Sequence, residues 1–282
     1  MLVELAIGDA YGAGFEYNTF EVIRKSNDLS RYIQHPKHKG TKPGMYTDDT
    51  QMSIAVTEAI ISGEPWTNIN LANRFVDCFK RDQREGYAGR FYQFLQQVKD
   101  GQDFLTKIKP QSDKSGAAMR SPPIGVYGTI EEVVKRATTQ ARITHDTADG
   151  VNAAITAALM THYFIYDLGS ASYLGDFVEI LVGEKWAKPW KGPVGSKGEM
   201  SVRAALTAVS RNTKMSELLK SCVAFSGDVD TVATIALAAA SCSKEYEQDL
   251  PINLYENLEN GAFGRDYLLK LNQQLMSLKK GQ

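Results

Sequence analysis

Apolar residues recur at the spacing of an α-helix along most of the chain. From Met52 to Ile60 they stand at positions i, i+3, i+4, i+7 and i+8, and the run ends before Gly63. The same spacing recurs over residues 91–98, 151–162, 202–209 and 229–240. Alternation with a period of two, which marks a half-buried strand, is scarce. The pattern therefore predicts an all-α fold.

Two predicted helices, 147–165 and 229–242, are rich in alanine and other small residues. Neighbouring helices can approach such segments closely on several sides, so we expect both helices to be central and buried. Segments 27–45, 107–128 and 183–198 have no helical pattern and are expected to be irregular. Because no repeat or linker-like segment interrupts the chain, we predict one compact domain over residues 1–282, with loops lining a site.

Composition narrows the class of protein. The 282 residues include 32 basic and 33 acidic side chains, so we expect no general nucleic-acid or membrane binding. Cys78, Cys222 and Cys242 show no paired spacing, which favours reduced thiols. No apolar run approaches about 18 residues, and Met1 is not followed by a basic leader, so we expect neither a membrane span nor a signal peptide. A cytoplasmic monomer is the expectation.

The first candidate site is Thr47-Asp48-Asp49, immediately before the predicted helix at 52–60. Thr and Asp at this place are also common helix caps, because they accept free backbone N–H groups and suit the helix dipole. Taken alone, the segment is explained at least as well by a cap as by a ligand site.

The second candidate site, Asp228-Val229-Asp230-Thr231, begins the alanine-rich helix. A cap needs one carboxylate, whereas two flank a valine here. Buried carboxylates are costly unless a cation compensates them, and neither motif contains Lys or Arg. The two motifs together favour hard divalent ions such as Mg²⁺ or Mn²⁺. The predicted metal ligands are Thr47, Asp48, Asp49, Asp228, Asp230 and Thr231.

Two glycine-containing segments are weaker signals. Gly12 and Gly14 predict a flexible turn that carries Glu16, although a solvated helix end explains this glutamate equally well. Small residues at 112–118 could expose backbone N–H groups to a phosphate, but the P-loop pattern is absent. Residues 84–91 either approach the same ligand or form a helix junction.

The order of these motifs resembles the ADP-ribosylglycohydrolases. It reads G-D-A-x-G-x-x-x-E, T-D-D-T, G-A-x-M-R-x-x-P, T-H and G-D-x-D-T, and it spans residues 5 to about 242. The resemblance implies a compact orthogonal multi-helix bundle with two Mg²⁺ or Mn²⁺ ions. It also implies a hydrolase that cleaves the glycosidic bond between ADP-ribose and a target.

The resemblance also implies roles for individual residues. Glu16 and Asp49 match catalytic carboxylates, and the six Asp and Thr positions match the metal ligands. The matching substrate contacts are Ser112, Ser115, Gly116, Ala117, Met119 and His145. Two departures from the family pattern are Lys114-Ser115-Gly116 in place of G-N-G, and Ser226 in place of a glycine.

Other functions and acceptors are left open by the sequence. ADP-ribosyl-arginine is the first choice of substrate, with serine, O-acetyl, polymer and nucleic-acid-base linkages as alternatives. His145-Asp146 also suggests an HD-type metal phosphohydrolase, but His35 and His38 lie in a Pro- and Lys-rich loop rather than on helices. A non-catalytic ADP-ribose-binding relative is disfavoured because Glu16 and all six predicted metal ligands are present.

Overall fold

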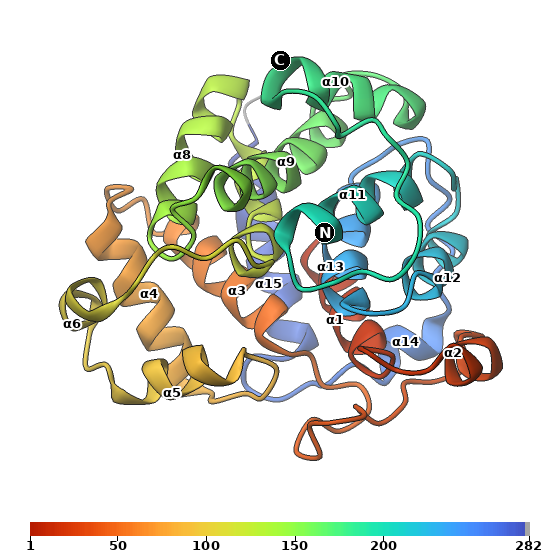
Figure 1. Ribbon diagram of the computed structural model, residues 1–282, viewed down its shortest axis with the longest axis horizontal. Helices are drawn as coiled ribbons and strands as arrows, with labels where there is room; N and C mark the ends of the chain where they lie inside the picture. The colour runs from red at the N-terminus through yellow and green to blue at the C-terminus, as the bar shows by residue number, and fades with distance from the viewer. Residues whose placement is uncertain (280–282) are drawn as a thin grey trace.

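The computed structural model describes residues 1–279, which form a bundle of helices joined by loops (Figure 1). The fold is 59% helical, with 15 α-helices and no sheet in the described part, so the all-α prediction is confirmed. The helices are α1 Leu2–Ala13, α2 Phe20–Ser26, α3 Asp48–Ile61, α4 Asn68–Arg81, α5 Gly89–Gln97, α6 Gly101–Lys107, α7 Gly116–Met119, α8 Ile130–Arg142, α9 Ala148–Ile165, α10 Leu174–Val182, α11 Gly198–Val209, α12 Met215–Ala224, α13 Val229–Ala240, α14 Ile252–Glu256 and α15 Arg265–Met276.

Helices α1, α9 and α13 form the centre of the bundle. Every residue of α13 is buried, as are all but one residue of α1 and 14 of the 18 residues of α9. Alanine and glycine make this possible, because small side chains let helix backbones approach on more than one side. The prediction that the two alanine-rich helices are central is confirmed.

Amphipathic helices surround this centre. In Figure 1, α4, α5 and α6 lie on one side of the molecule, whereas α11 and α12 lie on the other. α8 packs on α9, and α15 packs on α1 and α3. Most buried apolar side chains, from α1 to α15, belong to one continuous core. No helix in residues 1–279 combines the length and apolarity needed to cross a membrane.

Three segments were expected to be irregular, and the structure corrects one of them. No helix lies between α2 and α3 or between α10 and α11, as predicted. Segment 107–128, however, contains α7 and a short 3₁₀ helix, Pro122–Val126. Both are too short to show periodicity, and the proline pair that suggested a loop begins the 3₁₀ turn instead.

Candidate active site

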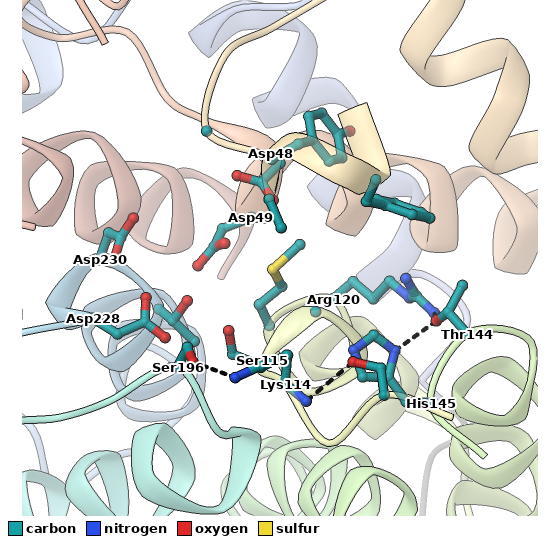
Figure 2. Close-up of a pocket in the computed structure, with 18 of the residues that line it drawn as sticks. Asp48, Asp49, Lys114, Ser115, Arg120, Thr144, His145, Ser196, Asp228 and Asp230 are labelled. Carbon is teal, nitrogen blue, oxygen red and sulfur yellow. Dashed lines mark hydrogen bonds between the residues drawn. The ribbon is translucent and has the colours of Figure 1, made fainter. Parts of the chain in front are cut away.

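A cavity of about 450 Å³ lies where the predicted motifs meet. This volume suits a small molecule. Figure 2 shows the aspartates of both motifs facing this space on one side, with Arg120 and His145 on the other, and the Lys114 amino group pointing to Ser196 beside Asp228. The lining residues come from segments 16–17, 48–49, 86–91, 108–120, 144–145 and 228–231, together with Ser196.

Asp9, on α1, positions the first aspartate pair. Its carboxylate accepts hydrogen bonds from the backbone N–H and hydroxyl groups of both Thr47 and Thr50, at 2.6–3.1 Å. From a neighbouring helix, Asp9 therefore accepts the N–H groups of the N-cap residue Thr47 and of Thr50 in the first turn of α3. Because the cap comes from Asp9, the carboxylates of Asp48 and Asp49 are available to the cavity.

Sequence reasoning missed this role of Asp9. The sequence did contain a signal, because Asp9 is the one acid in the otherwise apolar stretch Leu5–Ala10 of α1, and a buried carboxylate needs partners. Only the packing of α1 against α3 shows which partners those are.

The second aspartate pair stands at the start of α13, which a tight loop holds in place. The Asp228 N–H donates to the Val194 carbonyl at 3.0 Å, and Ser201 donates to the Asp228 carboxylate at 3.3 Å. Ser226, which replaces a glycine of the family pattern, has φ of +64°, a value that favours glycine. The Ser226 hydroxyl donates to the Asn18 carbonyl at 3.4 Å.

Carboxylate oxygens of Glu16, Asp228 and Asp230 lie within 4.8 Å of one another. Oδ2 of Asp49 and Oδ1 of Asp230 are buried and have no hydrogen-bond partner in the described chain. Hard divalent cations prefer carboxylate oxygens as ligands. The cluster therefore fits a Mg²⁺- or Mn²⁺-sized ion, since unpaired buried carboxylate oxygens are costly without a cation.

The electrostatics of the cluster lead to the same conclusion. Burial, followed by the neighbouring negative charges, holds the pKa of Asp49 and Asp230 well above the usual aspartate value. The pKa of Asp48 is also raised, and burial raises the pKa of Asp228 to about 7. No Lys or Arg forms an ion pair with these four aspartates within residues 1–279. A bound cation would relieve this repulsion.

Glu16 has a partner that the sequence did not indicate. Nε2 of His35, a side chain only 1% exposed, lies 2.8 Å from Oε2 of Glu16. His35 Nδ1 accepts the N–H groups of Lys37 and His38 at 3.0 and 3.1 Å, so the ring proton is on Nε2. The ring N–H is not aligned for a hydrogen bond, which makes the contact electrostatic. His35 comes from the loop that was expected to be irregular.

The rest of the cavity lining is rich in hydrogen-bond donors. Arg120 and His145 lie across from the aspartates, Lys109 and Lys114 also line the cavity, and Lys114 Nζ donates to the Ser196 hydroxyl at 2.7 Å. Of the predicted substrate contacts, the structure brings Ser112, Ser115, Gly116, Met119 and His145 to the cavity wall. Lys114, noted only as a departure from the family pattern, thus faces the site.

Some predicted residues do not reach the cavity wall. Ala117 is buried against Ala141 and Ala154, so its methyl group faces away from the cavity. Thr47 is fully buried and its hydroxyl donates to Asp9, whereas Thr231 lines the cavity.

Asp146 is exposed and pairs with Arg142 at 3.3 Å. The HD-type alternative is therefore wrong, because its aspartate is outside the site.

Residues 84–91 do approach the site. Gly86, Tyr87, Ala88 and Phe91 line the cavity together with Ile108, and they form an apolar wall. Gly86 is required there: its φ is +117°, and an added Cβ would lie 2.5 Å from Oδ1 of Asp48. Because position 86 has no side chain, the loop lies directly against the carboxylate of Asp48.

Comparison with known proteins agrees with this geometry. The profile of the ADP-ribosylglycohydrolase family matches residues 1–282. ADP-ribosylhydrolase ARH3 of Bos taurus is 30% identical over 189 residues, which cover 63% of this chain and 51% of that protein. ARH3 of Xenopus tropicalis is 23% identical, covering 96% of this chain and 93% of that protein. The chain therefore spans about half the length of the bovine relative but most of the frog one.

Two further likenesses extend the comparison. The ADP-ribosyl-[dinitrogen reductase] glycohydrolase of Rhodospirillum rubrum is 25% identical, covering 82% of this chain and 80% of that protein. A solved structure described as an ADP-ribosylglycohydrolase-related protein complex matches with a TM-score of 0.68 and 21% identity. That match covers 99% of this chain and 96% of the other, and it shows the shared fold.

Proposed function

Because the chain belongs to the ADP-ribosylglycohydrolase family, we propose that it hydrolyses the glycosidic bond between ADP-ribose and a modified target. The observation that carries the proposal is the two-ended cavity. Carboxylates that favour a cation lie at one end and Arg120 and His145 at the other, while Lys109 and Lys114 add positive charge to the cavity lining. ADP-ribose presents ribose hydroxyls and a diphosphate, which match these two ends in chemistry. Reversal of mono-ADP-ribosylation on arginine is our first choice of reaction.

The cofactor in this proposal is a pair of Mg²⁺ or Mn²⁺ ions. Asp48, Asp49, Asp228 and Asp230 would hold them, with Thr231 and Glu16 as further oxygen donors, whereas the Thr47 hydroxyl is bonded to Asp9. When bound, the ions would withdraw charge from the sugar and fix its vicinal hydroxyls. The support is the set of buried, unpaired carboxylate oxygens at Asp49 and Asp230.

The chain's own residues divide the remaining work. Glu16 borders the cavity and can exchange a proton, which suits a general acid or base at the scissile bond. Asp49 is the second candidate carboxylate, in keeping with the two carboxylates of glycoside cleavage. Ser112, Ser115, Gly116 and His145 would orient the diphosphate half of the ligand.

A panel of defined ADP-ribose linkages tests the function. Arginine, serine, O-acetyl, polymer and nucleic-acid-base linkages are incubated with the protein and Mg²⁺ or Mn²⁺, and free ADP-ribose is measured. We expect release from at least the arginine linkage, and none in the presence of a chelator. Asp48→Asn and Asp230→Asn should abolish release while helicity is retained. Binding of ADP-ribose without release from any linkage would instead identify a non-catalytic binding protein.

A further inference from the structure

Arg120 is a buried cation without an acidic partner in the described chain. Its side chain is 1% exposed, and the guanidinium lies 4.4 Å from the centre of the Phe75 ring. Nε donates to the Gln140 side chain at 2.7 Å, and Nη2 donates to the Gln140 carbonyl and to the Thr144 hydroxyl at 3.2 and 2.8 Å. Burying an arginine in this way is costly, so its contacts call for a reason beyond packing.

These contacts fix the direction of a short hydrogen-bond chain. A guanidinium can only donate, so the Thr144 hydroxyl oxygen accepts from Arg120. Nδ1 of His145 lies 2.7 Å from the same oxygen. The hydroxyl proton of Thr144 has no acceptor other than Nδ1 within hydrogen-bond distance in the described chain, so it is donated to Nδ1. His145 Nδ1 is therefore an acceptor, and the ring proton is on Nε2.

The protonated edge of His145 faces the cavity. Figure 2 shows the ring bonded to Thr144 on one side, with the opposite nitrogen towards Ser115 and Lys114. A Cβ added at Gly116 would lie 3.1 Å from Cε1 and 3.4 Å from Nε2, so this edge borders the 112–116 loop. Burial and the charge of Arg120 lower the pKa of His145 to about 3, which keeps the ring neutral near pH 7.

We propose that Arg120 and Thr144 are positioning residues that fix His145 as a neutral Nε2–H donor for an oxygen at the diphosphate end of ADP-ribose. The ligand in this inference rests on the proposed function. A fixed tautomer removes the need to reorient or protonate the ring on binding, so the donor is ready at any pH near neutrality. Positive charge in the cavity lining comes from Lys109, Lys114 and Arg120 rather than from an imidazolium.

The tautomer is tested directly by ¹⁵N NMR of the histidine rings in the full-length protein. The signals of His145 are identified by their loss in His145→Asn. We expect Nε2 to be protonated, with shifts that do not change between pH 5.5 and 8. Thr144→Val should give a mixture of tautomers, whereas Thr144→Ser, which keeps the hydroxyl, should match the wild type. A proton on Nδ1 in the wild type, or titration of His145 in this range, overturns the inference.

Calorimetric titration with ADP-ribose in Mg²⁺ provides the second test. Thr144→Val should weaken binding by roughly 3- to 10-fold, the range for one hydrogen bond, and Thr144→Ser should restore it. In a His145→Ala background the same valine substitution should change affinity little, because both residues act through one donor. A circular-dichroism melt of each variant shows that it is folded.

The outcomes separate the two proposals. Failure of the wild type to bind ADP-ribose overturns the proposed function, and with it the ligand assigned to His145. Wild-type binding that is unchanged in Thr144→Val overturns the positioning role alone. A loss in Thr144→Val that persists in the His145→Ala background also overturns it, because the effect would then be structural.

Discussion

Glu16 is held from two sides, and both contacts bear on its proposed chemistry. Its carboxylate faces His35 Nε2 at 2.8 Å, and the N–H of the next residue, Tyr17, donates to the Gly227 carbonyl at 2.8 Å. The second contact ties the turn to the loop that carries Asp228. The position of Glu16 relative to the aspartates is therefore set by neighbouring loops rather than by its own helix.

Replacing Glu16 with glutamine tests its role as an acid or base. Glutamine keeps the size and hydrogen-bonding capacity but cannot exchange a proton at neutral pH. Turnover of the best linkage should fall by roughly 10²- to 10⁴-fold, while the affinity for ADP-ribose changes little. Glu21→Gln, on the exposed surface of α2, is the matched control. A joint loss of Mg²⁺ affinity, ADP-ribose affinity and rate would show that Glu16 acts as a metal ligand instead.

His35→Asn separates the contact with Glu16 from the fold of the loop. The asparagine side chain can still accept hydrogen bonds from the N–H groups of Lys37 and His38. It is too short to replace the contact between His35 Nε2 and Glu16. Turnover should fall by up to about 100-fold, the scale of a small misplacement of a reacting group. Kinetics in the Glu16→Gln background provide the check. In that background, His35→Asn should lower turnover little further. If His35→Asn lowers turnover there as much as in the wild type, His35 does not act through Glu16.

At the scale of the helices, the glycines near the N-terminus have a different role from the one predicted. The sequence suggested that Gly12 and Gly14 make the Glu16 turn flexible. In the structure, a Cβ at Gly12 would lie 2.4 Å from Cα of Asp230, and one at Gly14 would lie 2.5 Å from Cγ1 of Ile33. Both glycines allow close packing, and sequence alone cannot distinguish that need from mobility.

Gly12→Ala is therefore expected to push α1 away from the start of α13. The added methyl group meets backbone atoms of Asp230 and Val229, which cannot rotate aside. We expect a loss of about 1–3 kcal/mol in the free energy of unfolding, measured in urea with a chelator present. Mn²⁺ affinity should fall as well, because Asp230 shifts. Gly261→Ala, where the Cβ meets nothing within 4 Å, is the control. Wild-type Mn²⁺ affinity in Gly12→Ala would refute the argument.

Across the whole molecule, the sequence predicted much of the site but not its supports. Small-residue composition predicted that α9 and α13 are central. Two aspartate motifs at helix starts, without nearby cations, predicted that Asp48, Asp49, Asp228 and Asp230 face one space. Asp9, His35 and the Arg120 contacts depend on helices and loops that meet only after folding, and no local spacing encodes them. The sequence singled out Lys114 only as a departure from the family pattern and did not predict that it lines the cavity.

The concentration of carboxylates also predicts how stability depends on pH without metal. The pKa of Asp228 is raised from 3.8 to about 7, and those of Asp48, Asp49 and Asp230 are also raised well above the ordinary value. For a carboxyl group with a raised pKa, the folded state binds more protons than the unfolded state. Stability from these groups is therefore present below about pH 4 and is lost as pH rises to 7 and beyond.

The Asp228→Asn variant isolates this effect. His145 and His162, whose pKa values are lowered by burial, favour the folded state as pH rises to about 6.5, so the wild-type melting curve alone mixes two trends. The variant keeps both histidines and removes one carboxylate.

With a chelator at pH 8, Asp228→Asn should melt above the wild type, by roughly 2–4 °C for each kcal/mol of repulsion removed. That advantage should shrink as the pH falls through 7 and disappear below the ordinary aspartate pKa of 3.8, where Asp228 is protonated in both states. In saturating Mg²⁺ the order should reverse, because the wild type gains the binding energy of the ion and the variant loses a ligand. If Asp228→Asn and the wild type melt at the same temperature at pH 8 with a chelator present, the four aspartates do not repel one another enough to affect stability.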